Sequence, residues 1–373
     1  MKKLFILFIA VAMVAAFTVP AMADAEWNFY GSARMATFSV DDDPDTPGVD
    51  SDTDTQWAQQ GNSRIGATVK FNDEIGGGFE MSDSFGKRKL YGTYNFGAGQ
   101  LLLGQTYTPS ANFYSNSVYD GDGDLLGVGE YYGGRLQMIQ LKFGGFKIAL
   151  IKNAATGAVY EQTAAVPVDV SGGINPVAAV NYDVDVTIPK IEASFRFATD
   201  MFHVKVFGGY QTFELESNVP GEVDPDDIDS LLYGVGAGVN FGPAYVKASV
   251  TAGQNLGDYG AYNPHGVNAG ANGGTAPGEV EDNDALGYLL VVGFKAGDAA
   301  TIEAGYGYQE YDSNLAGEQA DETTQMYVNA TINITKGFFI VPEIGIIDRD
   351  ESATSGDDQG DITYFGAKWQ INF

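Results

Sequence analysis

The sequence predicts an all-β chain that closes into a transmembrane antiparallel β-barrel of about sixteen strands. Three observations support this prediction. Apolar and polar residues alternate with a period of two along most of the chain. Very short connections between the candidate strands take turns with mostly long ones, as the periplasmic turns and extracellular loops of outer-membrane barrels do. After residue 23, polar residues interrupt every apolar run before the roughly 20 residues that a membrane helix needs, which leaves a closed barrel as the way to span lipid.

The first residues have the features of a secretory signal peptide. Two lysines are followed by an apolar stretch over residues 4–19 and by a small-residue cleavage site that ends at Ala23. We therefore expect residues 1–23 to be removed during export. The barrel should be built from residues 24–373.

The last strand shows the alternation most clearly. One face carries Phe365, Ala367, Trp369, Ile371 and Phe373. The other face carries Tyr364, Gly366, Lys368, Gln370 and Asn372. A strand with one apolar and one polar face fits a barrel whose outside meets lipid and whose inside meets water. A soluble sandwich or propeller is the alternative. A soluble sheet would pack its apolar face against a second apolar sheet, whereas here the opposite face carries Lys, Arg, Gln and Asn on strand after strand and so faces water. A propeller would show a blade repeat of roughly 40–50 residues, and none is present.

Turn residues divide the chain into candidate strands. These are 27–39, 62–72, 77–85, 88–96, 99–107, 132–143, 146–153, 189–198, 201–214, 229–241, 244–254, 285–296, 299–311, 323–335, 337–348 and 361–373. The long connections are 40–61, 108–131, 154–188, 215–228, 255–284, 312–322 and 349–360. The connection at Gly86-Lys87 is short where a long one is due. A further strand over 177–188 would change the count, and that alternative stays open.

Charge and composition restrict the function. The chain carries a formal charge of -29, or -31 without the two lysines of the signal, which opposes binding to nucleic acid. The acids concentrate in the long loops and the lysines near the short turns, so we expect an acidic outer mouth and a mildly basic inner one. The chain has no cysteine and only two histidines, His203 and His265, with no nucleophile placed beside either. We therefore expect no catalysis and no cofactor.

The connection 108–131 is the best candidate for a loop that folds into the barrel. It is long, acidic and aromatic, and its aromatic residues would pack poorly if the loop were fully exposed. Alternation places Arg34 and Arg64 on the polar, lumen-facing side of their strands, and Arg196 is similarly placed. Arg88 and Arg135 lie at strand ends, where the facing is ambiguous. Acids that face arginines across an opening would set up a transverse field that filters solutes.

The loop segment Asp120-Gly121-Asp122-Gly123-Asp124 begins like a calcium-binding EF-hand. That motif needs Gly at its sixth position and Glu at its twelfth, and here those positions hold Leu125 and Tyr131. We therefore do not expect an EF-hand or any other dedicated metal site. A looser calcium site made of loop carboxylates is the alternative.

Taken together, the signal peptide, the opening strand Trp27-Asn28-Phe29-Tyr30-Gly31, the long third loop and the final Trp369-Gln370-Ile371-Asn372-Phe373 resemble a Gram-negative general porin. The resemblance implies a homotrimer in the outer membrane, surrounded by lipid and lipopolysaccharide. It also implies that the barrel-assembly machinery reads Phe373. The third loop would form the pore constriction, with Asp120, Asp122, Asp124 and Glu130 on the loop and Arg34 and Arg64 on the wall. We count Arg135 as a further candidate for the constriction. The Pro-Glu-Phe-Gly-Gly signature of enterobacterial third loops is absent.

These features predict a water-filled channel for passive diffusion of small hydrophilic solutes and ions. A channel specific for sugars or anions is one alternative, and aromatic residues along the constriction would favour it. A plugged structural or adhesive barrel is another. The total charge favours cations, whereas arginines at the constriction would favour anions, so the sequence leaves the ion preference open.

Overall fold

The computed structural model describes residues 25–44, 51–153, 182–217, 224, 226–263, 270–273, 279–314, 318–350 and 358–373. The predicted signal peptide and His265 lie outside these residues. The first eight strands are β1 (Glu26–Asp43), β2 (Asp52–Gln59), β3 (Arg64–Lys70), β4 (Ile75–Ser82), β5 (Lys87–Asn95), β6 (Gln100–Tyr107), β7 (Arg135–Phe143) and β8 (Phe146–Ile151). The remaining strands are β9 (Tyr182–Asp185), β10 (Lys190–Ala198), β11 (Phe202–Ser217), β12 (Ile228–Phe241), β13 (Ala244–Gln254), β14 (Asn272–Gly273), β15 (Val280–Glu281), β16 (Asn283–Ala296), β17 (Ala300–Ser313), β18 (Asp321–Thr335), β19 (Phe338–Arg349) and β20 (Asp361–Asn372). One short helix, α2 (Tyr119–Asp122), interrupts the connection between β6 and β7.

Eighteen of the strand segments form a single antiparallel sheet that closes on itself. It closes because β1 pairs with β20 on one side and with both β2 and β3 on the other. β2 and β3 are successive parts of one barrel strand, and so are β9 and β10, which both pair with β11. The eighteen segments therefore make sixteen barrel strands, and the predicted sixteen-stranded barrel is confirmed. β9 lies in the region 177–188, where a further strand was the alternative, but it lengthens an existing barrel strand and does not change the count.

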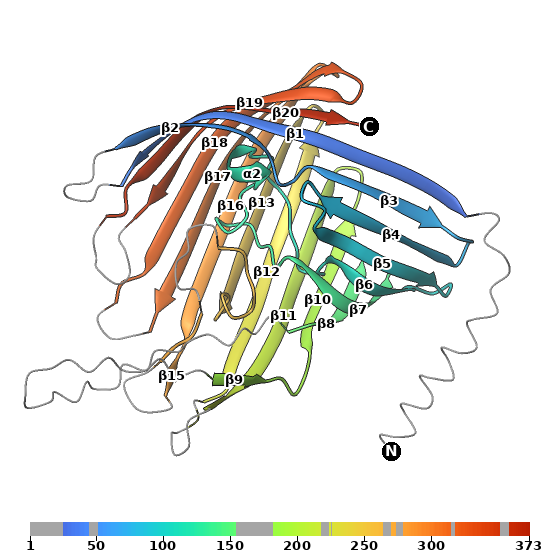
Figure 1. Ribbon diagram of the computed structural model, residues 1–373, viewed down its shortest axis with the longest axis vertical. Helices are drawn as coiled ribbons and strands as arrows, with labels where there is room; N and C mark the ends of the chain where they lie inside the picture. The colour runs from blue at the N-terminus through green and yellow to red at the C-terminus, as the bar shows by residue number, and fades with distance from the viewer. Residues whose placement is uncertain are drawn as a thin grey trace, which may run out of the picture.

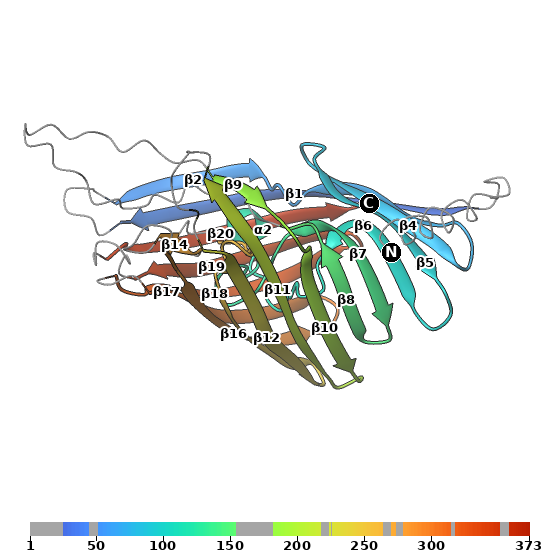
Figure 2. The ribbon, with the colours of Figure 1, turned by 90° about the horizontal axis from the view of Figure 1, so that it is seen from below.

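The wall of the barrel is uneven. β3 to β8 have 6–9 residues each, whereas β16 to β20 have 12–15. Figure 1 shows the tilted long strands curving around a central space, with α2 inside it. In Figure 2, which is turned by 90°, the short strands form a panel beside the long ones. The short turns that follow β5, β7 and β12 lie at the end of the barrel opposite β2, β9 and β14.

The distribution of polar and apolar side chains is the reverse of that in a soluble protein. On β18, Gln325 and Asn329 are buried at 7% and 3% exposure, while Met326 and Val328 are 46% and 51% exposed. On β20, Lys368 is buried and Trp369 is exposed. The polar residues point into the barrel and the apolar residues point out, as the alternation predicted. An apolar outer surface of this kind is stable in the hydrocarbon of a membrane.

The prediction that residues 40–61 form a loop is wrong in part. β1 continues to Asp43, and β2 pairs with it in register from Met35↔Gln59 to Asp42↔Asp52. The β2 sequence, Asp-Thr-Asp-Thr-Gln-Trp-Ala-Gln, lacks the apolar alternation of a lipid-facing strand. Strands that pair outside the hydrocarbon layer of the membrane need only backbone hydrogen bonds, so the sequence of β2 has no apolar pattern from which the strand could be predicted. β7 likewise begins at Arg135, three residues after the expected strand start.

Glycines make room on the inner wall for large aromatic side chains. A Cβ added at Gly236 on β12 would lie 2.3 Å from the ring of Tyr114, which belongs to the connection between β6 and β7. Tyr114 is 4% exposed. This close approach requires a residue without a side chain.

Gly236→Val should therefore push Tyr114 off the wall and lower the free energy of unfolding by about 1–3 kcal/mol. Gly92→Val is the matched control, because the nearest atom to a Cβ there is 3.9 Å away. Heat-induced loss of the compact gel band would report the difference. Equal melting of the two variants would contradict this account.

Candidate functional site

The loop between β6 and β7, residues 108–134, lies inside the barrel and is held there by the wall. Both oxygens of Glu343 on β19 accept hydrogen bonds from it. Ser117 Oγ donates at 2.9 Å, and the backbone N–H groups of Val118 and Tyr119 donate at 2.8 and 3.1 Å. Glu343 is 4% exposed. A buried carboxylate that accepts several backbone N–H groups is a strong, directional anchor.

Lysines on two other strands of the wall, β11 and β13, bind carbonyl groups of the same loop. Lys205 Nζ donates to the Ala111 carbonyl at 2.5 Å, and Lys247 Nζ donates to the Tyr114 carbonyl at 2.6 Å. The Ser110 N–H in turn donates to Glu192 at 3.0 Å. The wall therefore satisfies loop backbone groups that no strand partner could reach.

Aromatic packing completes the attachment. The rings of Tyr119 and Tyr364 stack with centroids 3.8 Å apart, and Phe38 meets Tyr119 edge-on at 5.4 Å. Val118 is fully buried in the same cluster. The aromatic content of the loop, which predicted that it packs against something, is explained by these contacts.

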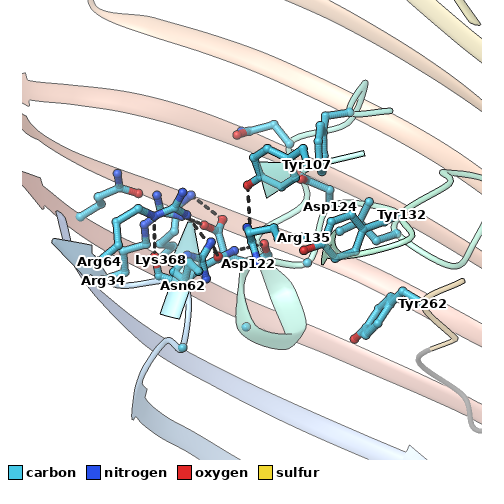
Figure 3. A pocket seen from close by; sticks show the side chains of 18 of the residues that line it. Arg34, Asn62, Arg64, Tyr107, Asp122, Asp124, Tyr132, Arg135, Tyr262 and Lys368 are labelled. Carbon is cyan, nitrogen blue, oxygen red and sulfur yellow. Dashed lines mark hydrogen bonds and ion pairs between the residues drawn. The ribbon is translucent and has the colours of Figure 1, made fainter. Parts of the chain in front are cut away.

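A cavity of about 680 Å³ lies between this loop and the wall. Its lining includes five basic side chains, namely Arg34, Arg64, Arg88, Arg135 and Lys368. It includes two carboxylates, namely Asp122 and Asp124. Figure 3 shows Arg34, Arg64 and Lys368 on one side, Tyr132 and Tyr262 on the other, and Asp122 and Arg135 between them.

Asp122 on α2 lies between two wall cations. Arg34 Nη1 on β1 is paired with one carboxylate oxygen, and Lys368 Nζ on β20 donates to the other at 2.6 Å. Asn62 also donates to the Asp122 backbone carbonyl at 2.9 Å. Asp122 therefore fixes the loop to the wall, and the two cations more than cancel its charge.

A second charged cluster surrounds Glu80 on β4. Arg88 Nε and Lys89 Nζ bind its two oxygens at 2.8 and 3.0 Å, and Arg64 lies 3.7 Å away. Arg88 and Lys89 are neighbours in sequence and would normally point to opposite faces. A register shift between β4 and β5 pairs Glu80 with Lys89 and Met81 with Lys87, which leaves Arg88 as an extra residue. This bulge turns both cations toward the lumen.

The far side of the cavity is aromatic. Tyr107, Phe113 and Tyr132 pack with centroids 5.1–6.1 Å apart, and Tyr262 lies 6.4 Å from Tyr132. Arg135 lies over the rings of Tyr107 and Tyr132 at 4.7 and 5.6 Å. These contacts are within the range of cation–π attraction.

Tyr262 belongs to a second loop that folds inward, residues 255–263. The Tyr262 N–H donates to the Tyr132 carbonyl at 2.8 Å. Tyr259 in the same loop is fully buried, and its carbonyl accepts from Lys190 Nζ at 2.8 Å. The sequence analysis did not predict this loop, although Tyr259 and Tyr262 are aromatic residues of the kind that indicated inward packing of 108–131.

Glu130 is not in the cavity lining, so its predicted place at the lumen is wrong. It is 2% exposed and accepts hydrogen bonds from the Tyr114 N–H and from both the N–H and Oγ of Ser115. Burial raises the pKa of Glu130 to about 7, against these hydrogen bonds. Glu130 holds the two ends of the loop together.

Asp124 lines the cavity near Glu130. Burial of its carboxyl, together with the nearby charges of Glu130 and Asp122, raises the pKa of Asp124 well above its usual range. The charged form of Asp124 is therefore less favoured than that of an exposed aspartate. The placement of the Asp120 side chain lies outside what the structure describes.

Acidification from pH 8 to pH 5 should tighten the loop. The pKa of Glu130 is higher in the folded loop than its usual 4.5, so the folded form binds the proton more strongly and gains stability as pH falls through about 7. Amide exchange over 113–131, corrected for intrinsic rates, should slow by at least about tenfold. Glu130→Gln, which cannot ionise, should show a much smaller change. An unchanged pH dependence in that variant would show that Glu130 is not responsible.

Other candidate residues lie elsewhere. Arg196 pairs across strands with Lys205 and does not line the cavity. His203 stacks on Tyr114 at 5.5 Å. Among the described ranges, no group of three or more His, Cys, Asp or Glu side chains is placed to hold a metal ion. In that same part of the chain, no helix is long and apolar enough to cross a membrane.

Comparison with known proteins adds to this picture. A family model described as Gram-negative porin matches residues 10–351. The outer-membrane channel DcaP of Acinetobacter baumannii aligns with a TM-score of 0.70 at 16% identity, over 95% of this chain and 99% of that one. An anion-selective porin from Comamonas acidovorans aligns at 0.58 and 14% identity, over 94% and 100%. The trimer form of OmpT from Vibrio cholerae aligns at 0.57 and 14%, over 94% and 99%.

At these identities the structural likenesses show the fold alone, and no curated protein sequence matches the chain. The family model, however, covers most of the chain, and the closed barrel has the polar inside and apolar outside that a membrane channel needs. The chain therefore belongs to the Gram-negative porins and is a multi-pass channel protein of the outer membrane.

Proposed function

We propose that this porin is a passive diffusion channel for small hydrophilic solutes, that the loop 108–131 forms its constriction, and that it prefers anions. The observation that carries the proposal is the charge of the cavity lining, which contains five cations and two carboxylates. The proposal includes no chemistry on the solute. The preference is set in the cavity, because a narrow passage concentrates the field of its own charges.

The balance of charges inside the cavity supports the anion preference. Asp122 is matched by Arg34 and Lys368, and Glu80 is matched by three cations. Asp124 is held toward its neutral form by its raised pKa. The excess positive charge lies where a solute would pass, whereas many of the acids of the chain, whose formal charge is -29, fall in the long connections that the sequence analysis expects at the outer mouth. Salt screens the outer charges within about 8–10 Å.

We assign the constriction to Arg34, Arg64 and Arg135 on the wall and to Asp122 and Asp124 on the loop, with Arg88 and Lys368 added from the structure. Asp120 stays a candidate on its sequence position alone. Glu130 is withdrawn, because it is buried inside the loop.

Planar-bilayer recording of the purified protein in a KCl gradient tests the proposal. Stable conductance steps with a reversal potential of the sign for Cl⁻ permeation are expected. A reversal potential of the opposite sign would overturn the anion preference. A folded, inserted barrel without conductance would instead favour a plugged structural or adhesive barrel.

We also propose a homotrimer, assembled in lipid and lipopolysaccharide after the assembly machinery has read Phe373. Phe373 is 72% exposed as a residue, while its backbone exchanges hydrogen bonds with Gly31 at 2.8 and 3.1 Å. The terminal ring is therefore available at the seam where the barrel closes. Conductance steps grouped in threes would support the trimer.

A further inference from the structure

We propose that the aromatic side of the cavity is a transit site for anions attached to an aromatic ring, such as aromatic carboxylates and sulfonates. This inference deepens the proposed anion channel and rests on it. The ring of the solute would lie against Phe113, Tyr132 and Tyr262, while its charged group would meet Arg135.

The first argument is the exposure of aromatic surface to water inside the channel. Phe113 is 43% exposed and Tyr262 is 40% exposed, and both line the cavity. Elsewhere on the inner wall the residues are mostly polar, as on β18. Apolar surface left in water is unfavourable, and a flat ring would cover it. Two separate loops that fold inward contribute these rings, so the exposed aromatic surface does not result from the alternation of a single strand.

The second argument is Arg135. The other arginines of the cavity have carboxylate partners, but among the described residues no carboxylate lies within ion-pair distance of Arg135. Its Nη2 donates to Tyr107 Oη at 3.0 Å, and its Nε is buried without a hydrogen-bond partner in that part of the chain. The guanidinium is held between rings, and its Nη1 has no hydrogen-bond partner among the described residues, so Nη1 is the donor left to bind an anion.

The third argument is the combination of the two features in one space. The cavity, at about 680 Å³, is of the size that small-molecule pockets have. A neutral sugar could stack on the rings but would not use the positive charge. A small inorganic anion would use the charge but not the rings. An aromatic anion uses both, and its binding must stay weak for passage to continue.

The test compares benzenesulfonate with cyclohexanesulfonate, which have the same charged group and differ in whether the ring is flat and aromatic. Sulfonates stay ionised and do not cross the lipid. Bi-ionic reversal potentials should show benzenesulfonate to be about three- to tenfold more permeant, in keeping with the strength of aromatic contacts. Equal permeabilities would overturn the inference.

Variants locate the preference. Phe113→Leu combined with Tyr262→Leu keeps apolar bulk but removes the aromatic faces, and it should bring the permeabilities of the two sulfonates within about twofold of each other. Phe339→Leu is the control, because Phe339 lines the same cavity beside Lys368 on the basic side. Loss of the preference in Phe339→Leu and not in the double variant would contradict the assignment.

Failure of this inference and of the proposed function can be told apart. A cation-selective reversal potential in KCl overturns the proposed function, whereas an anion-selective channel with no ring preference overturns only this inference. If the barrel does not conduct, titration calorimetry with the two sulfonates in detergent replaces the permeability measurement, and equal heats would overturn it. Interruption of the current by a neutral sugar, with no effect of benzenesulfonate, would point to a sugar site instead.

Discussion

Replacing both Arg64 and Arg88 with Gln should shift the channel from anions toward cations. The double variant removes two of the five cations that line the cavity and leaves Glu80 with only Lys89 as an ionic partner. At separations of several ångströms in a mostly aqueous lumen, each charge contributes roughly 0.5–1 kcal/mol. The ratio of Cl⁻ to K⁺ permeability should therefore fall by about tenfold or more.

The control for this experiment is Lys295→Gln with Lys336→Gln. It removes the same charge from exposed positions at the end of the barrel that carries the short turns, and it should change the reversal potential little. Since Glu80 is 2% exposed, the arginine variant also leaves a buried carboxylate poorly compensated. Adding Glu80→Gln restores the fold if that cost proves large, and it should retain a smaller shift of the same sign. An unchanged reversal potential in the folded double variant would show that selectivity is set elsewhere.

The second large effect is expected at Glu343, which anchors the constriction loop. Glu343→Ala removes the acceptor for Ser117, Val118 and Tyr119 and leaves the buried Tyr364 hydroxyl and Asn329 amide with one partner fewer. Losing several hydrogen bonds to a buried charge should weaken loop attachment by about 2–4 kcal/mol. Amide exchange over 115–125 should accelerate by about 30-fold or more, and single-channel recordings should become noisier with a higher open conductance.

Glu343→Gln is the matched variant, since its amide oxygen keeps one acceptor in place and its volume is the same. Its exchange rates should lie between those of the wild type and Glu343→Ala. If Glu343→Ala leaves exchange in the loop unchanged, the lysine contacts from Lys205 and Lys247 hold the loop by themselves.

The barrel was predictable because its determinants are local. Alternation with a period of two is a property of each strand alone, and the strand ends at β12, β13 and β20 lie within one residue of those expected. The inward packing of 108–131 also followed from local composition, since Phe113, Tyr114 and Tyr119 need something to pack against. β2 could not be predicted in the same way, because it has no lipid-facing side and is a strand only through its pairing with β1.

The candidate site was predictable only in outline. The facing of Arg34 and Arg64 followed from alternation, but Arg88 depends on a bulge that no local pattern shows. The sequence could not tell which loop acid reaches the cavity, and it placed Glu130 there although Glu130 is buried. Tyr262 was not predicted, because it comes from a loop that is more than a hundred residues away in sequence from Tyr132, on which it packs.

The sequence by itself thus determined a lipid-facing barrel with one aromatic, acidic loop turned inward, because burial of apolar side chains is encoded strand by strand. Only the tertiary structure decided the charge of the passage. That charge depends on which residues meet across the lumen, such as Asp122 with Arg34 and Lys368, and Glu80 with Arg88. Coulombic interaction depends on distance in space, and a chain that is strongly acidic overall can therefore enclose a basic cavity.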